Sequence, residues 1–311
     1  MIPSRLIYQF ITLCILMVAC IITGCADPQF LDKTRNDQSI LNGKPVQKDD
    51  SIAQRTVMIA QEIDFGADKP VFFGLCSGVL IEPQIVLTAA HCIAKNSTKM
   101  RVVLNPTPRN AELRGSRDVF SVHTYRVHPN YKHVETTDEI DLASRTDLAL
   151  IFLDRPTDHD FMLDYTNGKD FESNEYSVVM AGFGKTSDLK DTSNISHTKL
   201  NGQLFRANAV ITDSQTKDPY FSLDQWKSGG VCKGDSGSPV FILNPLTSKL
   251  SLFAIAIDVF KNNPEQDHLR DPGNIYSTCA SYGLFLNLKP HEQWIKNMSS
   301  EMATAAKLIR N

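Results

Sequence analysis

Short β-rich runs broken by turn residues are the feature that most restricts how this chain can fold. They recur between residues 71 and 288, where aliphatic, aromatic and β-branched residues alternate with turns containing Gly, Pro, Asn or Asp. Many short strands at modest spacing are typical of a β-sandwich or of β-barrels. The predicted strands are Val71–Leu80, Ile85–Leu87, Met100–Leu104, Val119–Val127, Leu148–Leu153, Tyr176–Gly182, Gln203–Ile211, Pro239–Leu243, Leu250–Phe260 and Gly283–Leu288.

The end of the chain has a different period. Its apolar residues recur at helical spacing, which predicts an amphipathic helix packed on the β domain. With 311 residues and 42% hydrophobic content, the chain can bury a large core, although its length allows one large all-β domain or two smaller ones. A net charge of -3 with mixed signs gives no reason to expect nucleic acid or an anionic membrane surface as a partner. The helical positions are Trp294, Ile295, Met298, Met302, Ala305 and Ile309.

The first 24 residues have the layout of a secretory signal peptide. A polar start with Arg5 precedes an almost continuously apolar run, which ends in small residues before Cys25. A transmembrane anchor is the alternative, but the run is short for spanning and has no basic flank on its far side. Its last residues, ITGC, resemble the lipobox of bacterial lipoproteins, in which the cysteine is acylated. That resemblance implies a bacterial source and a lipid on Cys25.

The polar segment 25–39 has no apolar period, so we expect a lipid-anchored tether or propeptide there. Residues 40–311 are then the folded domain. The cysteine count agrees with this division, because seven is odd and an exported protein rarely keeps a free thiol. Cys14 and Cys20 leave with the signal peptide and Cys25 is acylated. The remaining four suit two disulfides, whose pairing the spacing does not determine: Cys76, Cys92, Cys232 and Cys279.

Three polar residues stand at the edges of predicted strands. Ser236 lies in GDSGSP, a sequence that suits a sharply turned backbone with N–H groups aimed at a ligand, but also an ordinary turn. His91 in TAAHC could be a hydrogen-bonded core histidine. Asp147 could cap the strand that follows it. Taken together, in the chain order His, Asp, Ser, they indicate a catalytic group.

TAAHC, TDLALIFL and GDSGSP resemble the three signature blocks of the trypsin/chymotrypsin family of serine proteases. The resemblance extends from Ile40 to about Lys296. It implies an all-β fold of two packed antiparallel six-stranded β-barrels, with the active site between them and a C-terminal α-helix. It also implies that Ser236 is the nucleophile, His91 its general base and Asp147 the carboxylate that orients the histidine.

By the same resemblance, the backbone N–H groups of Gly234 and Ser236 form the oxyanion hole, and no metal or cofactor is required. The family also implies a disulfide from Cys76 to Cys92 that braces the loop carrying the histidine. A second, from Cys232 to Cys279, connects the nucleophile loop to the wall of the specificity pocket.

The sequence ILNG at Ile40 resembles the family's mature amino terminus, with departures at its second and third positions. In the family, the new ammonium group pairs with the aspartate before the nucleophile, here Asp235. The resemblance therefore implies a zymogen activated at Ile40, and the alternative is an ordinary strand start. Cleavage would follow Ser39, so the activating protease is not Arg/Lys-specific. Because no further cysteine retains the cut segment, cleavage would release the domain from its anchor.

The specificity pocket is assigned to Gly230, Val231 and Val259. Trypsin-like members carry an aspartate at the position of Gly230, so cleavage after Arg or Lys is disfavoured here. Val259 in place of the family's glycine favours small aliphatic substrate residues, and Asp258 stands where an aromatic is expected. The segment Lys261–Ser277 either restricts access or is an inert insertion.

The sequence thus predicts an exported serine endopeptidase that cleaves after small or apolar residues. We expect a monomer that acts on proteins or peptides, is activated by another protease or by itself, and meets the membrane only through Cys25. It is either a bacterial membrane lipoprotein or secreted after release. A silent homologue acting as a surface binding module is one alternative, and an esterase of another fold is a second.

Overall fold

We describe the fold from a computed structural model, and all elements named below belong to the unit Asp37–Asn311. The signal peptide and tether expected over residues 1–39, with Cys25, and the loop expected at Lys261–Ser277 lie outside the described residues. The structure describes residues 40, 43–63, 71–93, 99–109, 113, 115–132, 146–161, 175–184, 202–212, 214–215, 218–226, 228–244, 247, 249–260, 279 and 281–310.

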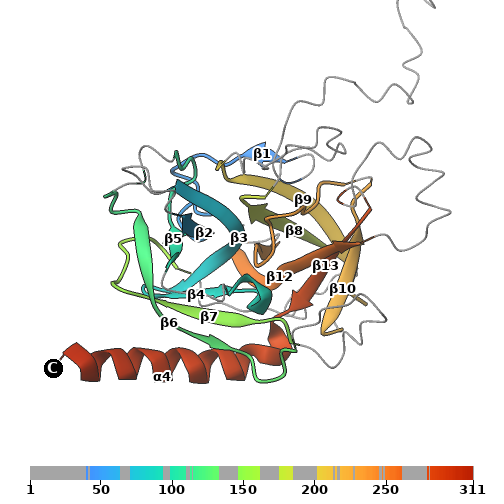
Figure 1. Ribbon diagram of the computed structural model, residues 1–311. Coiled ribbons are helices and arrows are strands. Elements are labelled where there is room, and N and C mark those ends of the chain that lie inside the picture. Colours follow the sequence, from blue (N-terminus) through green and yellow to red (C-terminus); the bar gives the residue numbers. More distant parts are fainter. Residues whose placement is uncertain are drawn as a thin grey trace, which may run out of the picture. The chain divides into compact units, whose positions relative to one another are not determined.

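The domain is mostly β, as the sequence predicts, and ends in one long helix (Figure 1). Its elements are β1 (Lys44–Pro45), β2 (Thr56–Ile63), β3 (Val71–Glu82), β4 (Ile85–Thr88), η1 (Ala90–Cys92), β5 (Met100–Val103), β6 (Val119–Val127), β7 (Ala149–Leu153), β8 (Glu175–Gly182), β9 (Phe205–Thr212), β10 (Tyr220–Asp224), β11 (Pro239–Leu243), β12 (Leu250–Phe260), β13 (Tyr282–Asn287), η5 (Lys289–His291) and α4 (Glu292–Arg310).

Strands β2 to β7 form a closed barrel in the order β2-β3-β4-β7-β6-β5. Every residue of β4 and β7 is buried, which explains their continuous apolar sequences. The two strands are antiparallel, with Thr88 opposite Ala149. The end of β4 and the start of β7 therefore lie at the same edge of the barrel. This register brings the segment after β4, with His91, beside the segment before β7, with Asp147.

The other strands form a seven-stranded sheet in the order β1-β9-β8-β11-β12-β13-β10. Strand β9 alternates between buried and more exposed residues, the pattern of a strand with one face on a core. The fold is chymotrypsin-like, as expected. Within the described residues, however, only the first of the two sheets closes into a barrel.

The hydrophobic core consists of two clusters of buried side chains. One fills the barrel, includes side chains of the seven-stranded sheet such as Phe241 and Leu286, and continues to α4 through Ile295 and Met302. The other belongs to the seven-stranded sheet and includes Ile40, whose side chain is fully buried ahead of β1. The residue expected to start the mature chain is thus part of the core of the second sheet.

Strands β1, β2 and β10 are absent from the strands predicted by sequence. The second half of β2 contains Ala60, Gln61 and Glu62, which are poor strand formers. Pairing on both sides, with β3 and with β5, holds this segment in the barrel. Tertiary pairing has overridden local propensity there.

The predicted C-terminal helix is α4, which runs alongside β6 and β7 (Figure 1). Over residues 292–305, the part of α4 whose side chains are described, Ile295, Ser299 and Met302 are buried, at the spacing of one helical face. An ion pair of 3.5 Å between Arg126 of β6 and Glu301 adds to this contact. Ala305, expected on the apolar face, is exposed. Among the described residues, no helix is long and apolar enough to cross a membrane.

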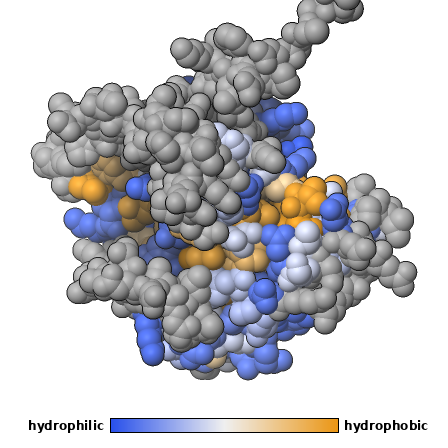
Figure 2. Space-filling model, turned by 90° about the vertical axis from the view of Figure 1, so that its right-hand side faces the viewer, coloured by the Kyte–Doolittle hydropathy of each residue, from blue (hydrophilic) through white to orange (hydrophobic). Residues whose placement is uncertain are grey.

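Hydrophobic residues reach the surface in small areas between hydrophilic ones, as one face of the molecule shows (Figure 2). Among the described residues, the exposed large hydrophobic side chains are Leu75, Tyr125, Phe161 and Val210. They come from separate parts of the chain, and isolated exposed apolar residues of this kind are normal for a folded protein.

Two histidines and a tryptophan form the contact at the start of α4. The ring of His128 lies 5.3 Å from that of His291 and 4.7 Å from that of Trp294, between ring centroids. Burial lowers the pKa of His128. Burial, together with the charge of His128, lowers the pKa of His291 to about 4. Nε2 of His291 is buried and has no hydrogen-bond partner among the described residues, so the contact requires a neutral ring.

We expect acid to weaken this contact. Because the pKa of His291 in the folded protein lies below its ordinary value of 6.5, the unfolded chain takes up the proton first as the pH falls. The free energy of unfolding should therefore decrease from about pH 6.5 to about pH 4, and His291→Phe should make thermal unfolding less sensitive to pH over that range. The same substitution at the exposed His123 is the control. Equal pH sensitivity of His291→Phe and wild type contradicts the assignment.

Candidate active site

The carboxylate of Asp147 holds His91 at two points. One oxygen, Oδ2, lies 2.7 Å from Nδ1 of the imidazole, and the other, Oδ1, accepts the backbone N–H of His91 at 2.9 Å. The side chain of Asp147 is 13% exposed and that of His91 is 34% exposed. These contacts fix the tautomer with the proton on Nδ1 and leave Nε2 as the basic nitrogen.

Opposing influences act on the protonation of His91. Burial, the largest of them, lowers its pKa, whereas the hydrogen bond to Asp147 and the charges of Asp147 and Asp258 raise it. The net effect is a pKa above the ordinary value of 6.5. Asp258 contributes from β12, in the other sheet.

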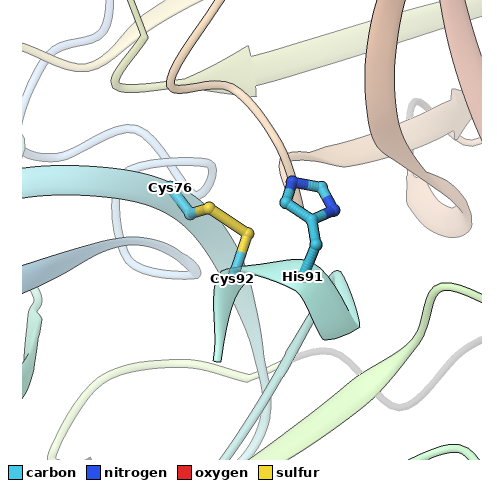
Figure 3. Close-up of side chains that lie close together, drawn as sticks. All are labelled: Cys76, His91 and Cys92. Atoms are coloured by element: carbon cyan, nitrogen blue, oxygen red, sulfur yellow. A yellow bond between two sulfur atoms is a disulfide. The ribbon is translucent and has the colours of Figure 1, made fainter. Parts of the chain in front are cut away.

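A disulfide braces the segment that carries His91. Cys76 of β3 is bonded to Cys92, the neighbour of His91 in η1, with a Cα–Cα distance of 6.0 Å (Figure 3). The three side chains lie close enough together for metal ligands. The two sulfurs are bonded to each other, however, so neither is available as a thiolate. The cluster therefore supports the loop and does not fit a metal ion.

The loop around Ser236 turns sharply at two glycines. Gly234 has φ 97° and Gly237 has φ 80°, conformations that other residues rarely adopt. A Cβ atom at Gly237 would also lie 2.1 Å from Oγ1 of Thr88, so the loop approaches β4 too closely for a side chain. The half-buried Ser236 donates its hydroxyl to the carbonyl of Ile257 at 3.2 Å rather than to His91.

The backbone N–H groups of Gly234 and Ser236 are the predicted oxyanion hole. Within the described part of the chain, neither group donates a hydrogen bond to the protein. Their neighbour Asp235 is different, because its N–H bonds to the carbonyl of Cys232 at 3.0 Å. The turn therefore leaves two donors beside the hydroxyl of Ser236.

The side chain of Asp235 is fully buried. It accepts N–H groups from Gly184 at 2.8 Å and from Cys232 at 2.9 Å. Burial is the dominant influence and raises its pKa to about 7, although the two N–H donors lower it. Each described contact of the Asp235 carboxylate is with an uncharged group. Among the described residues, no positive charge therefore balances this carboxylate.

A cavity of about 120 Å³ lies beside Ser236. Two of the three residues predicted for the specificity pocket, Val231 and Val259, line it, whereas Gly230 does not. The disulfide from Cys232 to Cys279 joins one wall to the segment before β13. The cavity is lined by Val231, Cys232, Lys233, Gly234, Asp235, Ser236, Ala256, Asp258 and Val259.

Sequence reasoning missed two residues whose hydrogen bonds position Asp147 and Ser236. The hydroxyl of Tyr220, on β10, accepts the backbone N–H of Asp147 at 3.1 Å. Ser77, on β3, donates its N–H to the carbonyl of Ser236 at 2.8 Å. Neither belongs to a recognisable motif, since each acts on a residue far away in the sequence.

Comparison with known proteins agrees with this geometry. Granzyme M from Homo sapiens is 30% identical over 53% of this chain and 63% of its own length. Clotting factor G beta subunit from Tachypleus tridentatus is 24% identical over 67% of this chain and 68% of its own length. A trypsin-like protease from Streptomyces glaucescens is 29% identical over 53% of this chain and 58% of its own length. The trypsin family matches residues 42–277. The chain belongs to the trypsin family of serine proteases.

Proposed function

We propose that the chain is a serine endopeptidase with Ser236 as nucleophile, His91 as general base and Asp147 as the residue that orients the base. The contact of Asp147 with both Nδ1 and the backbone N–H of His91 is the observation that carries the proposal. It leaves Nε2 as the basic nitrogen of His91, and Cys92, the neighbour of His91, contacts the carbonyl of Ser236 at 3.6 Å. A chymotrypsin-like fold also argues against an esterase of another fold.

In the proposed reaction, the hydroxyl of Ser236 rotates about its Cα–Cβ bond from the carbonyl of Ile257 to Nε2 of His91. Nε2 takes the proton as the oxygen attacks the substrate carbonyl, and the imidazolium then protonates the leaving amine. Water repeats the sequence to hydrolyse the acyl-enzyme. The carboxylate of Asp147 stabilises the imidazolium in both halves of the reaction.

The N–H groups of Gly234 and Ser236 are proposed to bind the oxyanion of each tetrahedral intermediate. Since they have no partner among the described residues, they need not break an existing protein hydrogen bond to do so. Each donor of this kind contributes about 3 kcal/mol to stabilising the transition state.

The substrates are proposed to be proteins or peptides cut after small or apolar residues. Gly230 offers no carboxylate where trypsin-like members carry one, so the partner that a substrate guanidinium or ammonium group finds in those proteases is missing at this position. Val231 and Val259 line the cavity with aliphatic groups.

We further propose that the chain is a zymogen cut between Ser39 and Ile40 by a protease of suitable specificity or by the enzyme itself. The new ammonium group would supply the counter-charge that the buried Asp235 lacks. Ile40 is fully buried and has φ 52°, which strains a β-branched residue by roughly 1–3 kcal/mol. Cutting the preceding peptide bond removes the carbonyl that causes this strain.

Residues 1–24 are proposed as a signal peptide and residues 25–39 as a tether acylated at Cys25. On this proposal the protein is an exported bacterial lipoprotein. Activation at Ile40 would release residues 40–311 from the membrane, since no other lipid attachment is proposed.

Labelling with a fluorophosphonate tests the enzyme against a silent binding module. We expect the cut wild type to be labelled on Ser236 and Ser236→Ala to remain unlabelled. His91→Ala should be labelled about 10²–10⁴-fold more slowly, because the base is missing. Circular dichroism confirms that the variants fold. An unlabelled wild type with Ile40 at its amino terminus sinks the proposal.

The pH dependence of the labelling rate tests the role of His91. Only the neutral imidazole acts as base, so the rate should fall as the pH drops through its pKa. Asp258→Asn removes a charge that raises that pKa, and should move the fall in rate to lower pH. Asp154→Asn, just beyond the far end of β7, is the matched control. A profile that does not move in Asp258→Asn contradicts the assignment.

Membrane fractionation tests activation and release. We expect wild type to accumulate as a soluble, labelled form that begins at Ile40. Ile40→Pro should block the cut and leave an unlabelled protein in the membrane fraction. The Cys25→Ser variant has no lipid anchor, so it should be absent from the membrane fraction even when it is not cut. An active form that begins at Ile40 and stays membrane-bound rules out the release.

A further inference from the structure

A fully buried glutamine, Gln225, is hydrogen-bonded to Val231, one of the residues that line the cavity beside Ser236. It directly follows β10, and its backbone N–H donates to the carbonyl of Ser281 at 2.9 Å. Its side chain is 0% exposed. Glutamine is rarely buried so completely unless its amide is hydrogen-bonded.

Three hydrogen bonds fix the orientation of the Gln225 amide. Nε2 donates to the carbonyl of Val231 at 2.9 Å and to the carbonyl of Cys279 at 2.7 Å. Oε1 accepts the N–H of Val231 at 2.6 Å. Both amide hydrogens are used, so the side chain connects the two segments that the Cys232–Cys279 disulfide also joins.

The amide occupies the space that side chains at two glycines would otherwise fill. A Cβ atom at Gly230 would lie 2.2 Å from Cδ of Gln225. A Cβ atom at Gly283, on β13, would lie 2.4 Å from its Oε1. Gly230 is the position at which trypsin-like proteases carry their pocket aspartate. The base of the pocket is therefore filled here from residue 225.

The cavity beside Ser236 is correspondingly small. Its volume is about 120 Å³, and neither Gln225 nor Gly230 is among its lining residues. For comparison, an engineered apolar cavity of about 150 Å³ in a protein binds benzene. Val259 lies opposite Gly283 in the pairing of β12 with β13 and lines the cavity. Its side chain therefore narrows the pocket at the mouth as well.

We propose that Gln225 determines specificity by closing the base of the pocket, which restricts the enzyme to short aliphatic residues before the scissile bond. The inference rests on the proposed endopeptidase function. The restriction is one of length rather than charge, because both amide hydrogens of Gln225 are already bound to backbone carbonyls. A longer polar side chain would meet the amide without gaining either donor.

Peptide substrates that differ only in the residue before the scissile bond test the inference. Wild type should prefer Ala and Val over Phe. Gln225→Ala opens the base, so the ratio of kcat/KM for the Phe peptide to that for the Ala peptide should rise at least about 10-fold. Gln225→Met fills similar space without the hydrogen bonds and should keep a ratio near that of wild type. An unchanged ratio in Gln225→Ala, or an equal rise in both variants, overturns the inference.

Gln215→Ala is the matched control, since Gln215 also donates its amide to the backbone of β10, to Ser222 at 2.7 Å, but does not line the cavity. Its substrate ratio should stay at the wild-type value. A separate sample of each protein is first tested for labelling at Ser236 with a fluorophosphonate, and unlabelled protein is used for the kinetics. If the wild-type protein is not labelled, the proposed endopeptidase function is contradicted. Labelled variants with unchanged ratios fail only the role of Gln225.

Thermal unfolding gives a second test that does not need activity. Gly230→Ala should lower the melting temperature, because its Cβ collides with the amide of Gln225. Combining it with Gln225→Ala should remove that collision, so that Gly230→Ala then costs little. If Gly230→Ala lowers the melting temperature equally in both backgrounds, Gln225 does not fill the space beneath Gly230 and the inference is overturned.

Discussion

The contacts of Ser77 set the position of the loop around Ser236 relative to the barrel that carries His91. From β3, the Ser77 N–H donates to the carbonyl of Ser236 at 2.8 Å and its hydroxyl donates to the carbonyl of Gly234 at 3.1 Å. The same hydroxyl accepts the N–H of Phe183, just after β8, at 3.0 Å. One buried side chain thus joins the barrel, the loop and the second sheet. Because acyl transfer tolerates little error in distance, a site shared between two sheets depends on such contacts.

Asp235 holds the other side of that loop. Its buried carboxylate binds the N–H of Gly184, and Cβ atoms at Gly182 or Gly184 would lie 2.1 Å and 2.5 Å from it. The end of β8 is therefore shaped around the carboxylate. A burial that raises the pKa of Asp235 to about 7 makes the loop sensitive to any cation brought near it. On the proposed activation, an ammonium group at Ile40 would be that cation, and the cut would be coupled to the geometry around Ser236.

The sequence was sufficient for the parts of the structure that depend on local pattern. The all-β class, the C-terminal helix and most strands follow from periodicity, and the two disulfides join the cysteines that the family resemblance pairs. Contacts between distant residues could not be predicted. Ser77, Tyr220 and Gln225 belong to no recognisable motif. In the sequence, Gln225 lies 54 residues from its partner Cys279, and Tyr220 lies 73 residues from its partner Asp147. Ser77 is farther still from its partner Ser236.

Gly230 illustrates why a missing residue is weaker information than an observed contact. Its lack of a side chain predicts a pocket without a carboxylate, and by itself it also predicts a deeper pocket. The structure instead places the amide of Gln225 within 2.2 Å of where the Cβ atom of residue 230 would be. The glycine is required because the side chain of Gln225, just after β10, fills its space. On the proposed specificity, the charge and the depth of the pocket are controlled from two different positions, and only the first can be recognised by aligning motifs around Ser236.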